Sequence, residues 1–570
     1  MRNIDWRGLV IAYLFFWFFS GLCHALLLGT GATGFTPLRQ GAIFSALWLI
    51  PLVLFPRQAR PIAAVIGFLL WTISLVNLGY FIIYGGEFSQ SVLFIVFESN
   101  PAEASEYLGN YFVWWLVPAV IGYSAAAYGL WTRVRPLDMP TQARALTLVL
   151  LAALLVLPPL SKVVRKREVN VETLAESYAN RMEPAVPWKF VTSFVRYREQ
   201  LAEVNTLLEH TKSIPPVAKL VDFHSGKPRT LVLVLGESTN RQHMSLYGYT
   251  RSTTPKLDAR RDQLAVFNQV FAPRPYTIEV MQQVLTFADQ ENPELYRTTP
   301  SLISIMKQAG YKTYWITNQQ TLTKRNTLLT SFSEQADEQV YLNHSQSQNS
   351  YQFDGDVLEP FGRFLKDDAP RRFIVIHLLG THMRYKYRYP PEFDVFKNKD
   401  GLPGWVTDKH LPMINEYDNA VRYNDEVVSG IIDTLDAAGS TSLLTYFSDH
   451  GEDVYDSPDH DFIGRNEARP TAPMYTVPFF LWSSAQWQQM ETRKFVGPNN
   501  PARNRVYQTS HFLHTWADLA GLRFEGFDPS KSLINPAFKE RPILVGDPAN
   551  PAGLFDLRTG LGTPTAAKVN

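Results

Sequence analysis

Residues 231–238 have the sequence Leu-Val-Leu-Val-Leu-Gly-Glu-Ser, an apolar run that stops at a glycine and is followed directly by a carboxylate. A second run, Leu-Leu-Thr-Tyr-Phe at 443–447, is followed by Ser-Asp-His-Gly-Glu at 448–452. Short runs of this kind favour buried parallel strands, and open α/β sheets assemble their sites at the carboxyl ends of such strands. A carboxylate from one strand and an Asp-His pair from another are typical ligands of a divalent metal. The two runs therefore predict a metalloenzyme.

The sequence around these runs predicts an α/β domain. Between about 228 and 545, further apolar runs at 313–316, 373–379 and 478–482 alternate with helical patterns. Such alternation is typical of βαβ units around a mostly parallel central sheet. We assign residues 228–570 to this domain.

Composition limits the remaining possibilities. A chain of 570 residues is long enough for two domains. Its 54 basic and 53 acidic residues nearly cancel, so charge gives no reason to expect a nucleic-acid partner. Cys23 is the only cysteine, which excludes internal disulfides and thiolate zinc sites. Any metal must bind through His, Asp, Glu or hydroxyl oxygen.

The N-terminal part predicts a helical membrane domain, assigned to residues 1–161. Each of its apolar segments approaches the roughly 17–25 residues that a helix needs to cross a bilayer. A signal peptide fits poorly, because the first segment has no small-residue cleavage site and more segments follow. The five segments are 8–29, 41–56, 61–84, 111–131 and 145–161.

The loops between these segments predict the orientation. Basic residues gather in the loops that share one side if all five segments cross, and this side is the cytoplasm. They are Arg2, Arg7, Arg57, Arg60, Arg133, Arg135 and Arg144. Five crossings then deliver everything after about residue 162 to the outside. The basic cluster at 162–167 opposes this assignment, and contact with anionic lipid would account for it.

A linker, residues 162–227, follows the membrane domain. Between about 172 and 213 it has a helical pattern in which Trp188, Phe190 and Phe194 alternate with Lys189 and other basic residues. Two interpretations stay open: an amphipathic, interfacial helix lying on the bilayer, or a linker helix packed on the soluble domain.

Three histidines lie near the expected site in the sequence. His377 is inside an apolar run, where a core histidine is the ordinary interpretation. His382, in Gly-Thr-His, lies just beyond that strand and is the better site candidate. His460 is in a polar loop ten residues after the Asp-His pair, so it either reaches the same pocket or is solvated.

Several motifs in fixed order resemble one known family. They are Gly-Glu-Ser-Thr at 236–239, Ser-Leu-Tyr-Gly-Tyr at 245–249, Thr-Thr-Pro at 253–255, Gly-Thr-His at 380–382, Tyr-Pro at 389–390, Tyr-Asp-Asn at 417–419 and Ser-Asp-His-Gly-Glu at 448–452. This set resembles the phosphoethanolamine transferases of the alkaline phosphatase/sulfatase superfamily, over essentially the whole chain. Segments 87–94 and 315–320 are most similar to the CptA type, which modifies the lipopolysaccharide core.

The resemblance implies a Zn²⁺ site formed by Glu237, Thr277, Asp449 and His450, with Thr277 as the nucleophile. One zinc or two stays open. From its local sequence alone, Thr277 is expected at a helix N-cap, a position that Ser, Thr, Asp and Asn prefer. The two roles are compatible, because a helix N-terminus favours a phosphate group.

The resemblance also implies the reaction. Thr277 would take phosphoethanolamine from phosphatidylethanolamine, releasing diacylglycerol, and an oxygen of the lipopolysaccharide core would then accept the group. His382 and His460 are candidates to stabilise the phosphoryl group, to move a proton or to bind a second metal.

Three further residues have two interpretations each. Arg325, with Lys324 beside it, either holds a phosphate oxygen or begins a solvated helix. Glu103 either holds the ammonium group of the substrate or is an ordinary interfacial acid.

The expected protein is a monomer in the bacterial inner membrane, in contact with its lipids and with the catalytic domain in the periplasm. Alternatives are transfer to lipid A or to a periplasmic glucan, a membrane-tethered phosphodiesterase, and a non-catalytic membrane protein.

Overall fold

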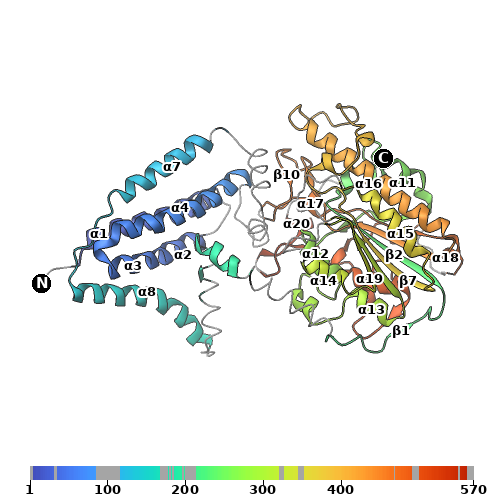
Figure 1. The fold of residues 1–570 in the computed structure, drawn as a ribbon, viewed down its shortest axis with the longest axis horizontal. Helices are drawn as coiled ribbons and strands as arrows, with labels where there is room; N and C mark the ends of the chain where they lie inside the picture. The colour runs from blue at the N-terminus through green and yellow to red at the C-terminus, as the bar shows by residue number, and fades with distance from the viewer. Residues whose placement is uncertain are drawn as a thin grey trace. The chain divides into compact units, whose positions relative to one another are not determined.

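The computed structural model of the chain divides into two compact units, Met1–Gln200 and Leu201–Asn570 (Figure 1). The residues that the structure describes are 4–30, 35–84, 114, 116–166, 178, 181–182, 185–195, 198, 213–319, 327–343, 352–467, 469–490, 500–549 and 553–560.

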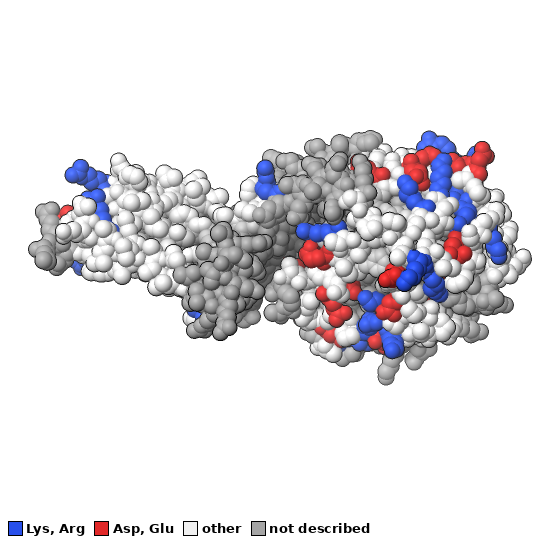
Figure 2. All heavy atoms as spheres, turned by 90° about the horizontal axis from the view of Figure 1, so that it is seen from below, with Lys and Arg blue, Asp and Glu red and all other residues white. Residues whose placement is uncertain are grey.

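The first unit is a bundle of apolar helices: α1 (Trp6–Gly29), α2 (Phe35–Ser45), α3 (Leu49–Leu54), α4 (Ala59–Tyr84), α7 (Leu116–Trp131) and α8 (Thr141–Lys166). Among the described residues, three helical stretches are long and apolar enough to cross a membrane: Trp6–Gly29, Phe35–Leu54 and Pro56–Ile82. Two shorter apolar helices, Leu116–Trp131 and Thr141–Leu157, coincide with the last two expected segments. Figure 2 shows a nearly uncharged face on this unit, with basic side chains gathered at one end.

Helix α1 forms the centre of this bundle and packs against α2, α4 and α7. Phe15, Phe16 and Phe19 are buried along it. A Cβ atom at Gly67 of α4 would lie 2.3 Å from the ring of Phe15, so a larger residue there would require this ring to move. Small residues at helix contacts are the usual means of close packing inside a bilayer.

Part of the expected linker packs on these membrane helices. Residues 188–195 are helical, and the Trp188 ring stacks on Trp48 with centroids 5.0 Å apart. Just before this helix, the Val186 N–H donates to His24 Nε2 across 3.1 Å. Val191, with the neighbouring apolar side chains, stays about half exposed. Contacts on one side and exposed apolar side chains on the other favour the interfacial interpretation.

The second unit contains a seven-stranded sheet in the order β3-β11-β8-β2-β7-β5-β6. Its strands are β2 (Arg229–Gly236), β3 (Leu264–Val266), β5 (Lys312–Thr317), β6 (Glu338–Tyr341), β7 (Arg371–His377), β8 (Ser442–Ser448) and β11 (Phe479–Ser483). The five strands from β8 to β6 pair in parallel, whereas β11 is antiparallel to both of its neighbours.

The sheet is therefore mixed: the pairings between β8, β2, β7, β5 and β6 are parallel, and both pairings of β11 are antiparallel. The sequence predicted a mostly parallel sheet, and the exception is β11, the expected run at 478–482. A parallel neighbour requires a long crossover to the opposite end of the sheet, usually through a helix. The connection 449–478 contains only short elements, β9 (Asp453–Val454), β10 (Ile463–Gly464) and α17 (Ala472–Tyr475), so the chain re-enters the sheet in the opposite direction.

Helices cover both faces of the sheet (Figure 1). One face packs on α11 (Pro255–Ala259), α15 (Leu358–Leu365) and α16 (Leu411–Ala437), and the other on α12 (Thr277–Val284), α13 (Leu302–Gln308), α14 (Thr327–Ser333) and α19 (Phe512–Ala520). Smaller elements are β1 (Val221–Asp222), β4 (Val270–Phe271), β12 (Tyr507–Gln508), β13 (Leu522–Arg523), β14 (Leu544–Val545), β15 (Phe555–Asp556), α18 (Ala485–Met490) and α20 (Leu557–Gly560).

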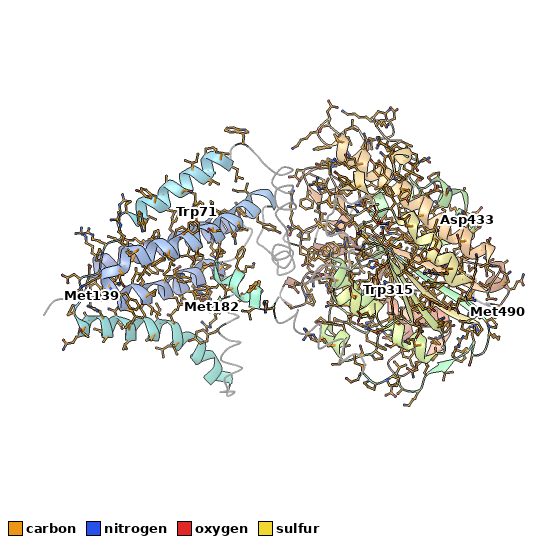
Figure 3. The ribbon with its side chains drawn as sticks, in the orientation of Figure 1. Trp71, Met139, Met182, Trp315, Asp433 and Met490 are labelled. Atoms are coloured by element: carbon orange, nitrogen blue, oxygen red, sulfur yellow. The ribbon has the colours of Figure 1, made fainter. Side chains whose placement is uncertain are left out.

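Strand β2 contributes to both hydrophobic cores. Leu231, Leu233 and Leu235 point into one core, and Val232 and Val234 point into the other. Burial on both faces explains why the run is continuous rather than alternating. Figure 3 shows Trp315 of β5, which lies on the far side of β7 from β2, inside this unit, and its side chain is only 1% exposed.

Candidate metal centre

The expected ligands lie at the ends of two adjacent strands. In the parallel pairing of β2 with β8, Gly236 is opposite Ser448. Glu237 therefore leaves one strand directly beside the point where Asp449 leaves the other. The Asp449 N–H donates to the Gly236 carbonyl across 3.0 Å and so extends the pairing into the site.

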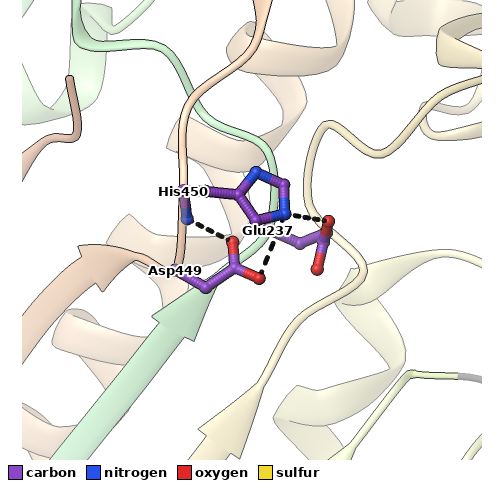
Figure 4. Close-up of side chains that lie close together, drawn as sticks. All are labelled: Glu237, Asp449 and His450. Carbon is purple, nitrogen blue, oxygen red and sulfur yellow. Dashed lines mark hydrogen bonds and ion pairs between the residues drawn. The ribbon is translucent and has the colours of Figure 1, made fainter. Parts of the chain in front are cut away.

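Glu237, Asp449 and His450 form one fully buried cluster (Figure 4). One ligand atom from each of the three residues lies within 4.8 Å of the others. His450 Nε2 is 3.2 Å from Glu237 Oε1 and 3.4 Å from Asp449 Oδ2. Two carboxylates and one imidazole are a ligand set that suits zinc.

Neighbouring hydrogen bonds orient these ligands. His450 Nδ1 lies 2.9 Å from the Gly451 carbonyl, which can only accept, so Nδ1 donates and the Nε2 lone pair faces the carboxylates. Asp449 Oδ1 accepts from the backbone N–H of His450 at 2.7 Å and of Ser238 at 3.2 Å. Buried Oδ2 accepts no hydrogen bond from the described residues. The donor set and this oxygen fit a cation bound between the three side chains.

The electrostatics of the cluster also favour a cation. Burial, and then the charge of Glu237, raise the pKa of Asp449 to about 7. Burial acts to raise the pKa of Glu237 too, but His450 and the neighbouring cationic groups hold it well below its usual range. Two fully buried carboxylates repel one another, and a bound divalent ion would remove that cost.

Thr277 lies beside the cluster. Its Oγ1 donates to Glu237 Oε2 across 2.8 Å and lies 3.5 Å from His450 Nε2. The sequence placed Thr277 at a helix N-cap, but the N-cap of α12 is Tyr276, whose backbone is extended, and Thr277 is the first helical residue. Because it does not cap the helix, the Thr277 side chain is directed to the carboxylate.

His382 reaches the same site from the end of β7. Asp354 accepts the backbone N–H groups of Leu379 at 2.8 Å and Gly380 at 2.7 Å, which fixes the loop. Gly380 has φ +56°, and a Cβ there would lie 2.6 Å from the Glu237 carbonyl oxygen. Burial lowers the pKa of His382 to about 3, so its ring is neutral.

Arg465 is a site residue that the sequence did not identify. Its Nη1 donates to Ser238 Oγ at 2.5 Å and lies 3.6 Å from Glu237 Oε1, while Nη2 is 3.4 Å from His382 Nε2. Glu452 Oε2 is 3.4 Å from the same guanidinium. A single arginine in Ile-Gly-Arg-Asn has no local pattern that distinguishes it from other arginines, so only the fold shows its position.

A buried ion-pair network supports the two strand ends from behind. His243 Nδ1 is 2.6 Å from Asp418 Oδ1, and its Nε2 is 3.1 Å from Asp456 Oδ2. Asn240, which follows β2, also donates to Asp456 Oδ2 at 2.9 Å. Burial acts to lower the pKa of His243, but Asp456 and Asp418 outweigh it and raise the pKa to about 10. Asp418 belongs to the Tyr-Asp-Asn motif at 417–419 that the sequence analysis used. No sequence pattern predicted that His243 and Asp456 would lie beside it.

Two further histidines considered in the sequence, His377 and His460, lie outside this cluster. His460 stacks on Trp405 with centroids 3.7 Å apart, and its Nδ1 donates to the Tyr455 carbonyl at 2.7 Å. His377 is buried within the sheet, as expected of a core histidine. Glu103, Lys324 and Arg325 lie outside the described residues.

Comparison with known proteins identifies the family. Residues 229–522 match the family model described as Sulfatase. Phosphoethanolamine transferase EptC of Escherichia coli (strain K12) is 48% identical over 559 residues, which are 97% of this chain and 96% of EptC. The chain belongs to the phosphoethanolamine transferases of the sulfatase family. This confirms the resemblance seen in the motifs.

Two further members extend the comparison. Phosphoethanolamine transferase CptA of Salmonella typhimurium (strain LT2) is 50% identical to this transferase over 559 residues, 97% of this chain and 96% of CptA. The crystal structure of the C-terminal periplasmic domain of E. coli EptC in complex with Zn matches with a TM-score of 0.60 and 50% identity. It covers 62% of this chain and 99% of that domain. A family member has therefore been solved with zinc, and this chain presents three buried metal-ligand side chains.

Proposed function

We propose that this protein transfers phosphoethanolamine from phosphatidylethanolamine to a sugar or phosphate of the lipopolysaccharide core. A zinc site of Glu237, Thr277, Asp449 and His450 would perform the transfer. One observation is the main support: the Thr277 hydroxyl, at the first turn of α12, donates to Glu237 inside the Asp449–His450 cluster. The identity of the transferred group is inferred from the relatives EptC and CptA, which are phosphoethanolamine transferases.

In the first step, Thr277 Oγ1 attacks the phosphorus of the donor lipid. The bond from phosphorus to the diacylglycerol oxygen breaks, and phosphoethanolamine is left on Thr277. The proton lost by Thr277 is balanced by the proton that the diacylglycerol oxygen takes up. A bound zinc ion lowers the pKa of a hydroxyl and neutralises phosphoryl charge. The N-terminus of α12 adds backbone N–H groups directed at the phosphate.

Arg465 and His382 form the other side of the phosphate site. The Arg465 guanidinium lies near the carboxylates of Glu237 and Glu452. Its cationic N–H groups would also bind phosphoryl oxygens by charge-assisted hydrogen bonds. In the second step, an acceptor hydroxyl oxygen attacks the phosphorus, the bond from phosphorus to Thr277 Oγ1 breaks, and the proton lost by the acceptor is balanced by the proton that Thr277 takes up. Neutral His382 accepts the hydrogen bond of the acceptor hydroxyl. His460 stays a prediction for this proton transfer.

The location is part of the same proposal. If all five predicted segments cross the bilayer, the arginine-rich loops lie in the cytoplasm and the catalytic domain lies in the periplasm of the bacterial inner membrane. Tethering the site to that membrane raises the effective concentration of a lipid donor. Glu103 for the ammonium group, and Lys324 with Arg325 for a phosphate oxygen, remain part of the proposal. So do a monomeric state and the number of zinc ions.

Mass spectrometry of lipopolysaccharide tests donor group and acceptor together. Cells that lack the gene are complemented with the wild type or with Thr277→Ala, and the core and lipid A fragments are analysed separately. We expect a phosphoethanolamine increment on the core with the wild type only. A phosphoethanolamine increment on lipid A or on periplasmic glucan would identify that molecule as the acceptor in place of the core. Release of free phosphoethanolamine without an increment would indicate a phosphodiesterase.

A further inference from the structure

The membrane unit has a basic cavity that the proposed reaction does not use. It has a volume of about 610 Å³ and is lined by Arg7, Arg60, Arg133 and Arg135, with the apolar side chain of Ile11 on its wall. No acidic residue lines it. Positive charge alone is common at the cytoplasmic ends of membrane helices. What distinguishes these four arginines is that they share one cavity.

The cavity is built from three separate helix ends. Arg7 lies in the first turn of α1, Arg60 in the first turn of α4, and the other two arginines follow the end of α7. The segment after α7 is fixed in place, because the Leu137 N–H donates to the Pro56 carbonyl at 3.0 Å. Leu137 is 5% exposed and lies against α1, where a Cβ at Gly8 would be 2.8 Å from its Cδ2.

Two of the guanidinium groups are held in place by neutral partners. Arg60 lies over the Trp131 ring, 4.7 Å from its centroid, and the Trp131 Nε1–H donates to the Arg60 carbonyl at 3.2 Å. Arg133 Nη1 donates to the Gly129 carbonyl at 3.0 Å. Asp5, the nearest acid along α1, accepts the Gly8 N–H as a helix cap. Within the described residues no ion pair neutralises the four arginines.

We propose that this cavity binds the phosphodiester group of an anionic membrane phospholipid. Several arginines around one phosphate form charge-assisted hydrogen bonds with it. They attract a headgroup with a net negative charge more strongly than a zwitterionic headgroup. The apolar side chains on the wall suit the glycerol and acyl chains of a lipid, and Trp131 beside Arg60 is typical of the interface region. The site differs from the catalytic one in its ligand and in its residues.

Native mass spectrometry of the full-length protein in detergent tests this proposal, with phosphatidylglycerol as the probe. Arg60→Gln combined with Arg133→Gln should lower lipid retention about tenfold or more, from about 1 kcal/mol per basic residue. Arg57→Gln combined with Arg144→Gln is the matched control, since both residues are basic and lie outside the lining. The control should retain phosphatidylglycerol like the wild type, and retention of phosphatidylethanolamine should be equal in all three proteins.

Three results would overturn the proposal: no loss in the cavity variant, an equal loss in the control, or displacement of the lipid by millimolar inorganic phosphate. The last would identify a free-anion site. If the cavity variant does not fold, lipid retention by the wild type is measured with and without added salt instead. Phosphatidylglycerol retention should then fall while phosphatidylethanolamine retention holds, and no effect of salt would reject the site. None of these results depends on catalysis, so the transferase proposal stands or fails separately.

Discussion

The Thr277 hydroxyl donates a hydrogen bond to Glu237 Oε2 across 2.8 Å and so joins the first turn of α12 to the end of β2. This contact places the only hydroxyl nucleophile proposed for the site against a buried metal-ligand carboxylate. It also joins Thr277 directly to the other proposed zinc ligands.

Thr277→Ala should abolish transfer, with a loss of about 10³-fold or more, because no covalent intermediate can form. Thr277→Ser keeps a hydroxyl and should keep measurable activity. Thr277 is partly exposed in a first helical turn, so the thermal midpoint of either variant should change little. Phosphoethanolamine transfer to lipopolysaccharide is the assay, and an active Thr277→Ala protein would reject the covalent route.

Removal of metal should abolish activity, and zinc should restore it. Asp449→Asn keeps the shape of the side chain but removes the charge, so bound zinc should fall at least about tenfold. Elemental analysis of the purified proteins measures the metal, and His377→Gln, altered in a buried histidine outside the ligand cluster, is the control. Full activity after exhaustive chelation would contradict a zinc site.

Arg465→Gln should lower kcat by about 10²-fold, because a preorganised donor to the phosphoryl group is lost. Arg465→Lys keeps the charge without the planar fork and should recover only part of the rate. Arg469→Gln is the matched control: it lies on the same loop, is 30% exposed and pairs with Asp461. Equal losses in Arg465→Gln and Arg469→Gln would show a general effect on the loop.

Gly380→Ala should damage the site more than Gly248→Ala. Both glycines have positive φ, so both substitutions incur backbone strain of about 1–2 kcal/mol. At Gly248 the added Cβ meets nothing within 4 Å, whereas at Gly380 it lies 2.6 Å from the Glu237 carbonyl oxygen. Thermal midpoints and zinc content measured together separate strain from displacement of Glu237. Similar thermal midpoints and an unchanged zinc content in both variants would contradict the expected displacement of Glu237.

The His243 network should stabilise the fold less as pH rises. The two carboxylates raise the pKa of His243 from its ordinary value of 6.5 to about 10. The contribution of protonated His243 to the stability of the fold is therefore fully present below about pH 6.5 and is lost as pH rises toward 10. The difference in thermal midpoint between wild type and His243→Gln should narrow over this range. Residues 213–570 alone can be used, since the E. coli counterpart was solved as a domain. A difference in thermal midpoint that stays constant over this pH range would contradict the raised pKa of His243.

The candidate metal-binding group of Glu237, Asp449 and His450 could be predicted because its signal is local. Glu237 and the Asp449–His450 pair each follow a buried apolar run directly, and parallel strands bring such positions to one edge. Thr277 was found only through the family resemblance, since its own neighbourhood predicts no more than a helix start.

Other parts of the site could not be predicted, because they depend on distant segments. Arg465 approaches Glu237 only after the loop 449–478 has folded back, and the same loop reverses the direction of β11. Composition makes 478–482 a strand but does not specify its direction. His243 likewise depends on Asp418 and Asp456, which are more than 170 positions away in the chain.

The pairing of Gly236 with Ser448 has a consequence for how such chains can change in length. Side chains alternate between the two faces along a strand, so one inserted or deleted residue within 231–237 or 443–450 would turn a ligand away from its partners. Neither strand can absorb the change at an edge, because each is paired on both sides. Single-residue insertion scanning should therefore find two short intolerant windows here, separated by loops that accept extra residues.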